Sequence, residues 1–126
     1  MVRLLLMKVL LIGLRANAVN YTKWPDLSPE KLEAAFANVT RTLEAAGYSA
    51  RWCLTDAGPT ASVEVQEALR ADPPELVLIG AGLRTDPELL FLFEQILNVV
   101  HAHAPAARIC FNSSPFDSVE AVKRWS

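Results

Sequence analysis

The sequence of 126 residues predicts one α/β domain in which helices cover both faces of a four-stranded parallel sheet, giving three layers. Apolar runs typical of strands alternate with helical patterns along the whole chain. The runs at Leu4–Gly13 and Leu76–Ile79 are apolar without alternation, which is typical of strands covered on both faces. The length is that of one average domain, so we expect residues 1–126 to form a single unit.

The start of the chain has two interpretations. Met1–Leu14 is short, basic and apolar, and Ala16-Asn17-Ala18 resembles a signal-peptidase site, as in a secretory leader. Lys8 interrupts the apolar stretch, and removing the segment would take away the central strand, so we favour a buried strand over Leu4–Gly13. Met7 is then a second candidate for the natural start. The stretch is too short to span a membrane.

A long connection over Leu14–Leu27 follows the first strand. Strand-to-helix loops usually have about 2–6 residues, and those above about 12 are usually functional or disordered. Tyr21, Trp24 and Pro25 give this connection an apolar character. They are consistent with a lid over a ligand, with an interface strip, or with packing of the loop on its own domain.

The first helix has clear boundaries. Ser28 is placed to cap it, Pro29 occupies the first helical position, Glu30 lies in the first turn, and Gly47 follows its end. Its buried face is predicted by apolar residues at three- and four-residue steps, namely Leu32, Phe36, Val39, Leu43 and Ala46.

The remaining elements follow in a regular β-α order. We expect strands at Tyr48–Leu54, Leu76–Ile79 and Arg108–Phe111; helices at Ala61–Ala71 (capped by Thr60 and ended by Asp72-Pro73-Pro74), at about Pro87–His103, and from Ser114-Pro115 to about Trp125. Right-handed crossovers then give the strand order 2-1-3-4. In such sheets functional residues gather beyond the carboxyl ends of the strands.

Several polar or glycine residues fall at that edge of the predicted sheet. Two arginines, two glycines and amide and hydroxyl groups could together surround a small anion. Alternatively, the glycines only form a tight turn and Ser114 only caps the last helix. Arg15 and Arg84 are the strongest candidates, because an arginine at a strand end has no capping role. The candidate anion-binding residues are Arg15, Gly80, Gly82, Arg84, Asn112 and Ser113.

Well-known nucleotide and phosphoryl-transfer sites are not indicated. Gly80-Ala81-Gly82 lacks the third glycine of a dinucleotide fingerprint and follows the wrong strand. A phospho-acceptor receiver domain shares this architecture but needs carboxylates to hold magnesium. Gly13-Leu14-Arg15 and Gly80-Ala81 occupy the places where those carboxylates would stand.

Metal and triad chemistry are not predicted either. His101 and His103 point to different sides of a helix and lie at the opposite end of the domain from Ser113 and Cys110. We therefore assign no catalytic residue, no metal ligand and no cofactor. Cys53 and Cys110 fall on strands at opposite sides of the sheet, too far apart for a disulfide. Two free thiols fit a reducing compartment and predict a cytoplasmic protein.

Charge and apolar patterning bear on partners. The net charge of -2 without a basic run does not favour binding to nucleic acid or a membrane surface. The helix predicted at Pro87–His103 is apolar on more than one face, because Leu90, Phe91 and Leu97 lie outside its main stripe. Such a helix is either deeply buried or lies at an interface. Deep burial is hard to arrange in a sheet of four strands, so these three residues favour a homodimer contact.

The segments Val77–Arg84, Leu92–His101 and Ala104–Pro115, with the tail Ala121–Trp125, resemble a family of short bacterial proteins of uncharacterised function with a receiver-like or flavodoxin-like fold. The resemblance covers most of the chain and implies a bacterial, cytoplasmic, stand-alone domain. It implies no activity, cofactor or catalytic residue. The connection after Gly13 departs from the pattern expected there, which leaves its role open.

Our first functional hypothesis is a non-catalytic module that binds a protein partner or a small anion at the carboxyl edge. The second is an enzyme for a phosphorylated or carboxylate metabolite held by Arg15 and Arg84. A flavin or nucleotide carrier is the third and weakest hypothesis.

Overall fold

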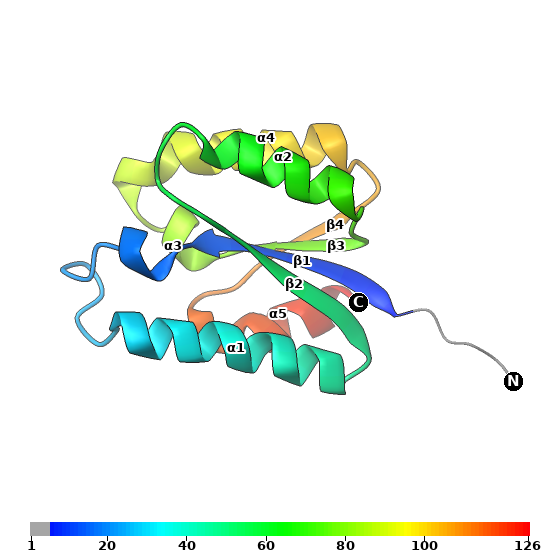
Figure 1. Cartoon of the computed structure of the whole chain (residues 1–126), viewed down its shortest axis with the longest axis horizontal. Helices are drawn as coiled ribbons and strands as arrows, with labels where there is room; N and C mark the ends of the chain where they lie inside the picture. The colour runs from blue at the N-terminus through cyan, green and yellow to red at the C-terminus, as the bar shows by residue number, and fades with distance from the viewer. Residues whose placement is uncertain (1–5) are drawn as a thin grey trace, which may run out of the picture.

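Four parallel strands form one sheet in the order β2-β1-β3-β4, as the sequence predicts. The structure, a computed structural model, describes residues 6–126 (Figure 1). The first two residues of the strand expected at Leu4–Gly13 therefore lie outside the described residues. The strands are β1 (Met7–Leu14), β2 (Tyr48–Thr55), β3 (Leu76–Ile79) and β4 (Arg108–Phe111).

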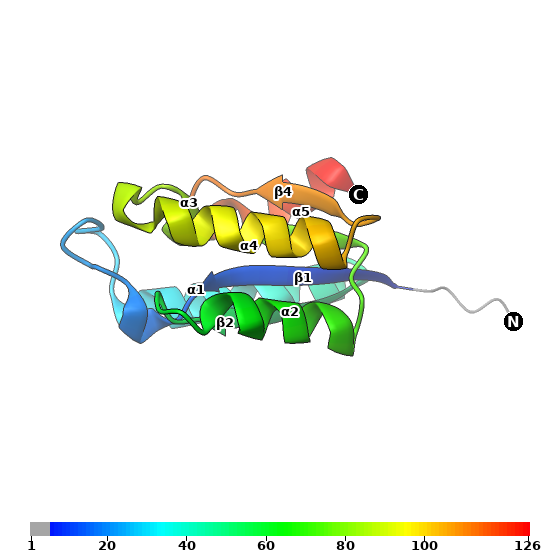
Figure 2. The same ribbon diagram turned by 90° about the horizontal axis from the view of Figure 1, so that it is seen from above.

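Helices cover both faces of this sheet, as in flavodoxin-like domains. On one face lie α2 (Ala61–Ala71) and α4 (Leu90–His103), and on the other α1 (Pro29–Ala45) and α5 (Ser118–Trp125) (Figures 1 and 2). Each face has its own cluster of buried apolar side chains, which confirms the three-layer prediction.

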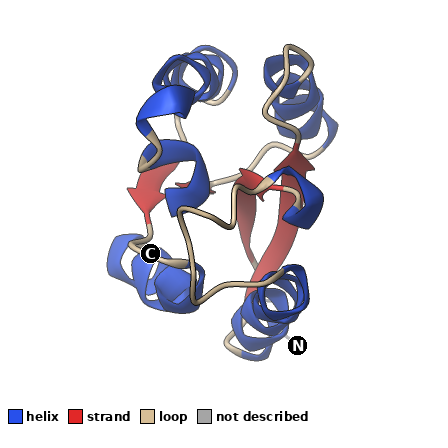
Figure 3. Cartoon of the chain, turned by 90° about the vertical axis from the view of Figure 1, so that its left-hand side faces the viewer, coloured by secondary structure: helices blue, strands red, loops and turns tan. Residues whose placement is uncertain are grey.

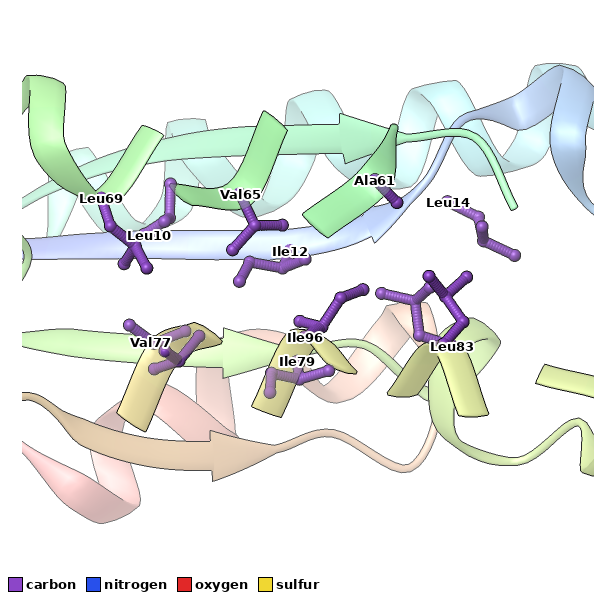
Figure 4. Packing of buried hydrophobic residues seen from close by; sticks show 12 residues of the cluster. Leu10, Ile12, Leu14, Ala61, Val65, Leu69, Val77, Ile79, Leu83 and Ile96 are labelled. Carbon is purple, nitrogen blue, oxygen red and sulfur yellow. The ribbon is translucent and has the colours of Figure 1, made fainter. Parts of the chain in front are cut away.

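The central strand β1 explains the continuous apolar run. Leu10 and Ile12 pack in the cluster beneath α2 and α4, whereas Val9 and Leu11 pack in the cluster beneath α1 and α5. All four side chains have no solvent exposure. Figure 4 shows the first cluster, where side chains of β1 and β3 meet those of α2 and α4. A strand buried on both faces has no position for an alternating polar residue.

Helix boundaries agree with the predictions in part. The Ser28 hydroxyl accepts a hydrogen bond from the Lys31 amide at 3.2 Å, and Gly47 adopts a positive φ of 94° beyond the end of α1. The predicted cap at Thr60 is wrong. This residue already has helical backbone angles, and its hydroxyl lies 3.4 Å from the Glu64 carboxylate instead of an amide.

Other boundaries differ from expectation for local reasons. The helix expected at Pro87–His103 begins with a 3₁₀ turn, η2 (Pro87–Leu89), and the last helix is likewise preceded by η3 (Pro115–Asp117). In each case a proline follows a residue whose side chain accepts an amide bond two positions on, which tightens the first turn. The predicted tight turn at Gly80–Gly82 is a short helix, α3 (Ala81–Arg84).

The connection between β1 and α1 contains a further 3₁₀ turn, η1 (Ala16–Ala18). β1 and β2 each run one residue further than predicted, because Leu14 pairs with Thr55. Cys53 and Cys110 are free and lie on β2 and β4, the two edge strands, as predicted. Within residues 6–126, no helix combines the length and apolar character needed to cross a membrane.

Candidate functional site

A small apolar hollow lies at the carboxyl edge of the sheet, between the ends of β1 and β3, the start of α1 and the connection that follows η1. Figure 3 looks onto this edge and shows the connection running across it. We call it the central hollow; its volume is about 40 Å³. It is lined by Gly13, Leu14, Val19, Trp24, Leu27, Leu32, Phe36, Trp52, Gly80, Ala81, Gly82, Asn112 and Pro115.

The three glycines at this hollow differ in how much space a larger residue would have. A Cβ at Gly13 would lie 3.3 Å from the Trp52 ring, and one at Gly80 would lie 3.2 Å from the Ile12 carbonyl oxygen. Close packing therefore favours glycine at both positions. A Cβ at Gly82 would meet nothing nearer than Leu14 Cδ1 at 4.0 Å. The fold does not require glycine at Gly82.

Asn112 is buried where β4 ends, and it joins three elements. Its Oδ1 accepts a hydrogen bond from the Ala81 amide at 2.7 Å, and its Nδ2 donates to Ser118 Oγ at 3.0 Å. These bonds hold the start of α3 and the start of α5 against the end of the sheet. Because both ends of the amide have protein partners, Asn112 acts as a structural brace at the edge of the central hollow.

Arg84 also contacts the end of β4. Its Nη2 donates to the Asn112 carbonyl oxygen, and the guanidinium carbon lies 5.2 Å from the centre of the Phe111 ring. Its Nε is buried and has no hydrogen-bond partner among the described residues. One donor of this arginine is therefore left unpaired at the edge of the sheet.

Arg15 contacts acidic residues that follow β2, the outer strand opposite β4. Its guanidinium lies 2.8 Å from an Asp56 carboxylate oxygen and 3.3 Å from one of Glu64. The hydrogen bond to Asp56 raises the pKa of Arg15 above its ordinary value. Asp56 follows β2 and Asn112 follows β4, and these are the two outer strands of the sheet. Arg15 and Arg84 therefore both lie at the carboxyl edge but point toward opposite outer strands.

The predicted hydroxyl residues form a local cap. Ser113 Oγ donates to the Asp117 carboxylate, which also accepts from the Ser113 and Ser114 amides at 3.0 and 3.1 Å. Burial alone would raise the pKa of Asp117, but these hydrogen bonds outweigh it and hold the pKa below its ordinary value. Ser114 caps the turn as the alternative interpretation expected.

Two aromatic residues that the sequence did not single out for function form one wall of the central hollow. The rings of Phe36 and Trp52 are tilted at 49° with centroids 4.6 Å apart, and Trp52 Nε1 donates to the Phe36 carbonyl at 3.0 Å. Phe36 was predicted only as a core residue of its helix. The sequence signal that could have indicated this wall was Trp52, a tryptophan on a strand that ends at the same edge of the sheet.

The connection over residues 19–27 forms the outer wall. Trp24 is half-buried and lines the central hollow, which is consistent with both the lid and the packing interpretations. Tyr21 OH donates to the Ala16 carbonyl at 2.5 Å. Lys23 Nζ lies 2.6 Å from the Asp86 carboxylate, and this hydrogen bond raises the pKa of Lys23 and lowers that of Asp86.

Groups suited to nucleophilic or metal chemistry are dispersed. Burial raises the pKa of the Cys53 thiol and raises that of Cys110 to about 11, so both thiols are protonated at neutral pH. His101 and His103 are exposed in the last turn of α4, away from the carboxyl edge. Residues 6–126 contain no group of three or more histidine, cysteine or acidic side chains placed to share a metal ion.

The predicted dimer residues on α4 differ in exposure. Phe91 is 72% exposed and Leu90 55%, at the first turn of the helix. Leu97 is half-buried and packs against the core beneath α2 and α4. The exposed apolar part of α4 is therefore confined to the end that borders the carboxyl edge.

Comparison with known proteins does not assign a family. Neither the protein-family models nor the curated proteins include a match to this chain, so the functional argument depends on the geometry of the site.

Proposed function

We propose that this protein is a non-catalytic binding module whose ligand contacts the carboxyl edge of the sheet. The observation that carries the proposal is the central hollow, which lies where β1 and β3 diverge to helices on opposite faces. Open α/β sheets bind ligands at such switch points. The hollow is lined by apolar side chains, glycine backbone and the amide of Asn112, a lining suited to binding rather than to proton or group transfer.

The chemistry of this edge supports binding over catalysis. Gly13 is the penultimate residue of β1 and Gly80 directly follows β3, near the places where a receiver domain needs its acidic residues. Ser113 is paired with the carboxylate of Asp117 in a turn, and the half-buried Cys53 and the buried Cys110 both have thiols with a raised pKa. A nucleophile needs a base within hydrogen-bond reach. The Asp117 carboxylate beside Ser113 has a lowered pKa and already accepts two amide bonds, which makes it a weak base, and the two histidines lie at the other end of α4.

A small anion is the second candidate ligand, and the unpaired Nε of Arg84 favours it. An anion there would share the guanidinium with the Asn112 carbonyl. Arg15 would have to leave Asp56 and Glu64 to join the same anion. An enzyme acting on a phosphorylated or carboxylate metabolite would need the same rearrangement.

We also propose that the protein forms a homodimer through the first turn of α4. Phe91 and Leu90 are the large apolar side chains exposed there, and Phe111 at the end of β4 is 37% exposed. Replacing Phe91 by Glu is expected to shift the solution mass from dimer to monomer, measured by light scattering. An unchanged mass, or a monomeric wild type, contradicts this proposal.

We also propose that the protein is bacterial and cytoplasmic. The resemblance of the segments around Val77–Arg84 and Ala104–Pro115 supports a bacterial origin, and the two free thiols support a cytoplasmic location.

The binding proposal is tested by thermal shift with inorganic phosphate, small carboxylates and apolar aromatic compounds, followed by amide chemical-shift mapping of each compound that raises the melting temperature. We expect the shifts at residues 13–15, 80–84 and 112–115. For an anion, Arg84→Ala should abolish the effect and Arg70→Ala, on exposed α2 surface, should not. No binding by any compound class, or shifts confined to the amino edge, contradicts the proposal.

A further inference from the structure

Trp24 borders three hollows at the carboxyl edge. Besides the central hollow, one of about 160 Å³ lies toward η3 and is lined by Leu27, Pro115 and Phe116 among others. Another of about 190 Å³ lies toward η2 and includes Gly82 in its lining. Trp24 is the one residue that lines all three. Trp24 therefore borders each of the three spaces.

None of these hollows is large enough by itself for a metabolite. Sites for small molecules usually have volumes of about 300–1,000 Å³, whereas these three have about 40, 160 and 190 Å³. Displacement of the Trp24 indole would add the volume of the ring to the spaces that it borders. A ligand that enters this edge would occupy the place of the indole.

The connection that carries Trp24 is held mainly by side chains. Within the described chain, the backbone hydrogen bonds of residues 20–27 are made to one another and none reaches the sheet. The ties to other elements are Tyr21 to Ala16, Lys23 to Asp86 and Glu88, and Lys31 to the Asp26 carbonyl. Moving Trp24 outward therefore breaks no strand pairing and no helical hydrogen bond.

The lining indicates the chemistry of the ligand. No charged residue of the described chain lines the central hollow. One wall is the Phe36–Trp52 pair, whose Trp52 ring covers Gly13, and the backbone at Gly80 and Gly82 adds surface without side chains. Alanine forms helices better than glycine and would fit at position 82, yet a larger side chain there would fill the hollow. These features favour a flat, uncharged ring.

We propose that the carboxyl edge binds an uncharged bicyclic aromatic compound, whose ring takes the place of the Trp24 indole beside the Phe36–Trp52 pair and the backbone at Gly80 and Gly82. This inference rests on the proposed binding function and specifies the class of ligand. A polar substituent on the ring would face the charged residues that border the outer hollows, Lys23 and Asp86 among them.

The test uses quinoline as the probe, at neutral pH where it is uncharged, with ¹⁵N-labelled full-length protein. The indole N–H signal of Trp24, assigned with Trp24→Phe, should shift in a saturable way. The signal of Trp125, on the opposite edge, should not shift. Gly82→Leu should weaken binding about tenfold or more, whereas Gly58→Leu, where a Cβ meets no atom within 4 Å, should leave the affinity within about twofold. Lys23→Met should tighten binding, because it releases the connection from Asp86.

The outcomes separate this inference from the proposed function. If quinoline produces no saturable shift at Trp24 but phosphate shifts the amides of residues 80–84, the aromatic class is wrong and the binding function stands. If neither probe nor any carboxylate binds, both are wrong. Should Gly82→Leu fail to fold by circular dichroism, Gly82→Ala supplies the smaller block. Quinoline binding that neither substitution weakens also overturns the proposal.

Discussion

The carboxyl and amino edges of the sheet are built from different chemistry. At the carboxyl edge, aromatic side chains and glycines surround apolar hollows, and a long connection crosses the strand ends. At the amino edge, charged side chains close short turns. Lys8 Nζ lies 2.8 Å from the Asp72 carboxylate, and Arg51 Nη2 donates to the carbonyls of Ala68 and Asp72 at 2.6 and 2.8 Å.

The amino edge has the larger hollow, about 370 Å³, but its polar groups are already used. The Glu75 carboxylate accepts a hydrogen bond from the Lys8 amide at 3.2 Å, and Arg108 Nη1 donates to the Trp125 carbonyl at 2.9 Å. Polar groups that complete turns stabilise the fold. The apolar side chains at the surface of the carboxyl edge complete no turn, so they are available to contact a ligand.

The largest effect is expected from the brace at the carboxyl edge. Asn112→Ala leaves the buried Ala81 amide without its acceptor and removes the donor to the Ser118 hydroxyl, which keeps only its bond to the Pro115 carbonyl. It should lower the free energy of unfolding by roughly 2–4 kcal/mol. Asn98→Ala, which removes only an exposed bond to the Glu94 carbonyl, should change it by less than about 0.5 kcal/mol. Urea denaturation measures both. Equal effects would show that Asn112 is not a structural brace.

The amino edge should be sensitive to loss of a donor. Arg51→Met leaves the Ala68 and Asp72 carbonyls at the end of α2 without the guanidinium, and should cost about 1–2 kcal/mol of stability. Arg15→Met removes exposed ion pairs at the carboxyl edge and should have a smaller effect. Thermal denaturation in low and high salt compares the two. A larger loss for Arg15→Met would reverse the assigned roles of the two edges.

The two glycines of α3 and its cap should respond in opposite directions. Gly80→Ala places a methyl group 3.2 Å from the backbone oxygen of Ile12 on the central strand and should destabilise by about 1–2 kcal/mol. Gly82→Ala has room and should stabilise by about 0.5–1 kcal/mol. Chemical denaturation of both variants tests this. Destabilisation by Gly82→Ala would mean that the fold does need glycine there.

The smallest effect is expected from the ionisation of Cys110, a buried residue of β4. Burial raises the pKa of Cys110 to about 11, above its ordinary value of 9.0. Since the unfolded thiol ionises first, its contribution to stability is complete below pH 9 and is lost as the pH rises toward 11. The loss at pH 10 is about 1 kcal/mol. Urea denaturation at pH 8 and pH 10 should show this difference in the wild type and not in Cys110→Ala.

Local sequence signals predicted much of the fold. The apolar runs at residues 9–12 and 76–79, Ser28 with Pro29, and Gly47 each act through neighbouring residues or through simple burial, and the structure confirms them. The order 2-1-3-4 followed from the handedness of crossovers. Thr60 failed as a cap because the preceding turn already gives it helical angles, which its residue type does not reveal.

The candidate site depended more on tertiary structure. The sequence determined by itself that Arg15, Gly80, Arg84 and Asn112 follow strand ends, because this depends only on where apolar runs stop. Only the tertiary structure decided what these residues contact. Arg15 meets Asp56 and Glu64 across the sheet, and Arg84 meets the Asn112 carbonyl. The hollow beside Trp24 likewise depends on how the connection crosses the sheet, since its walls come from segments far apart in the chain.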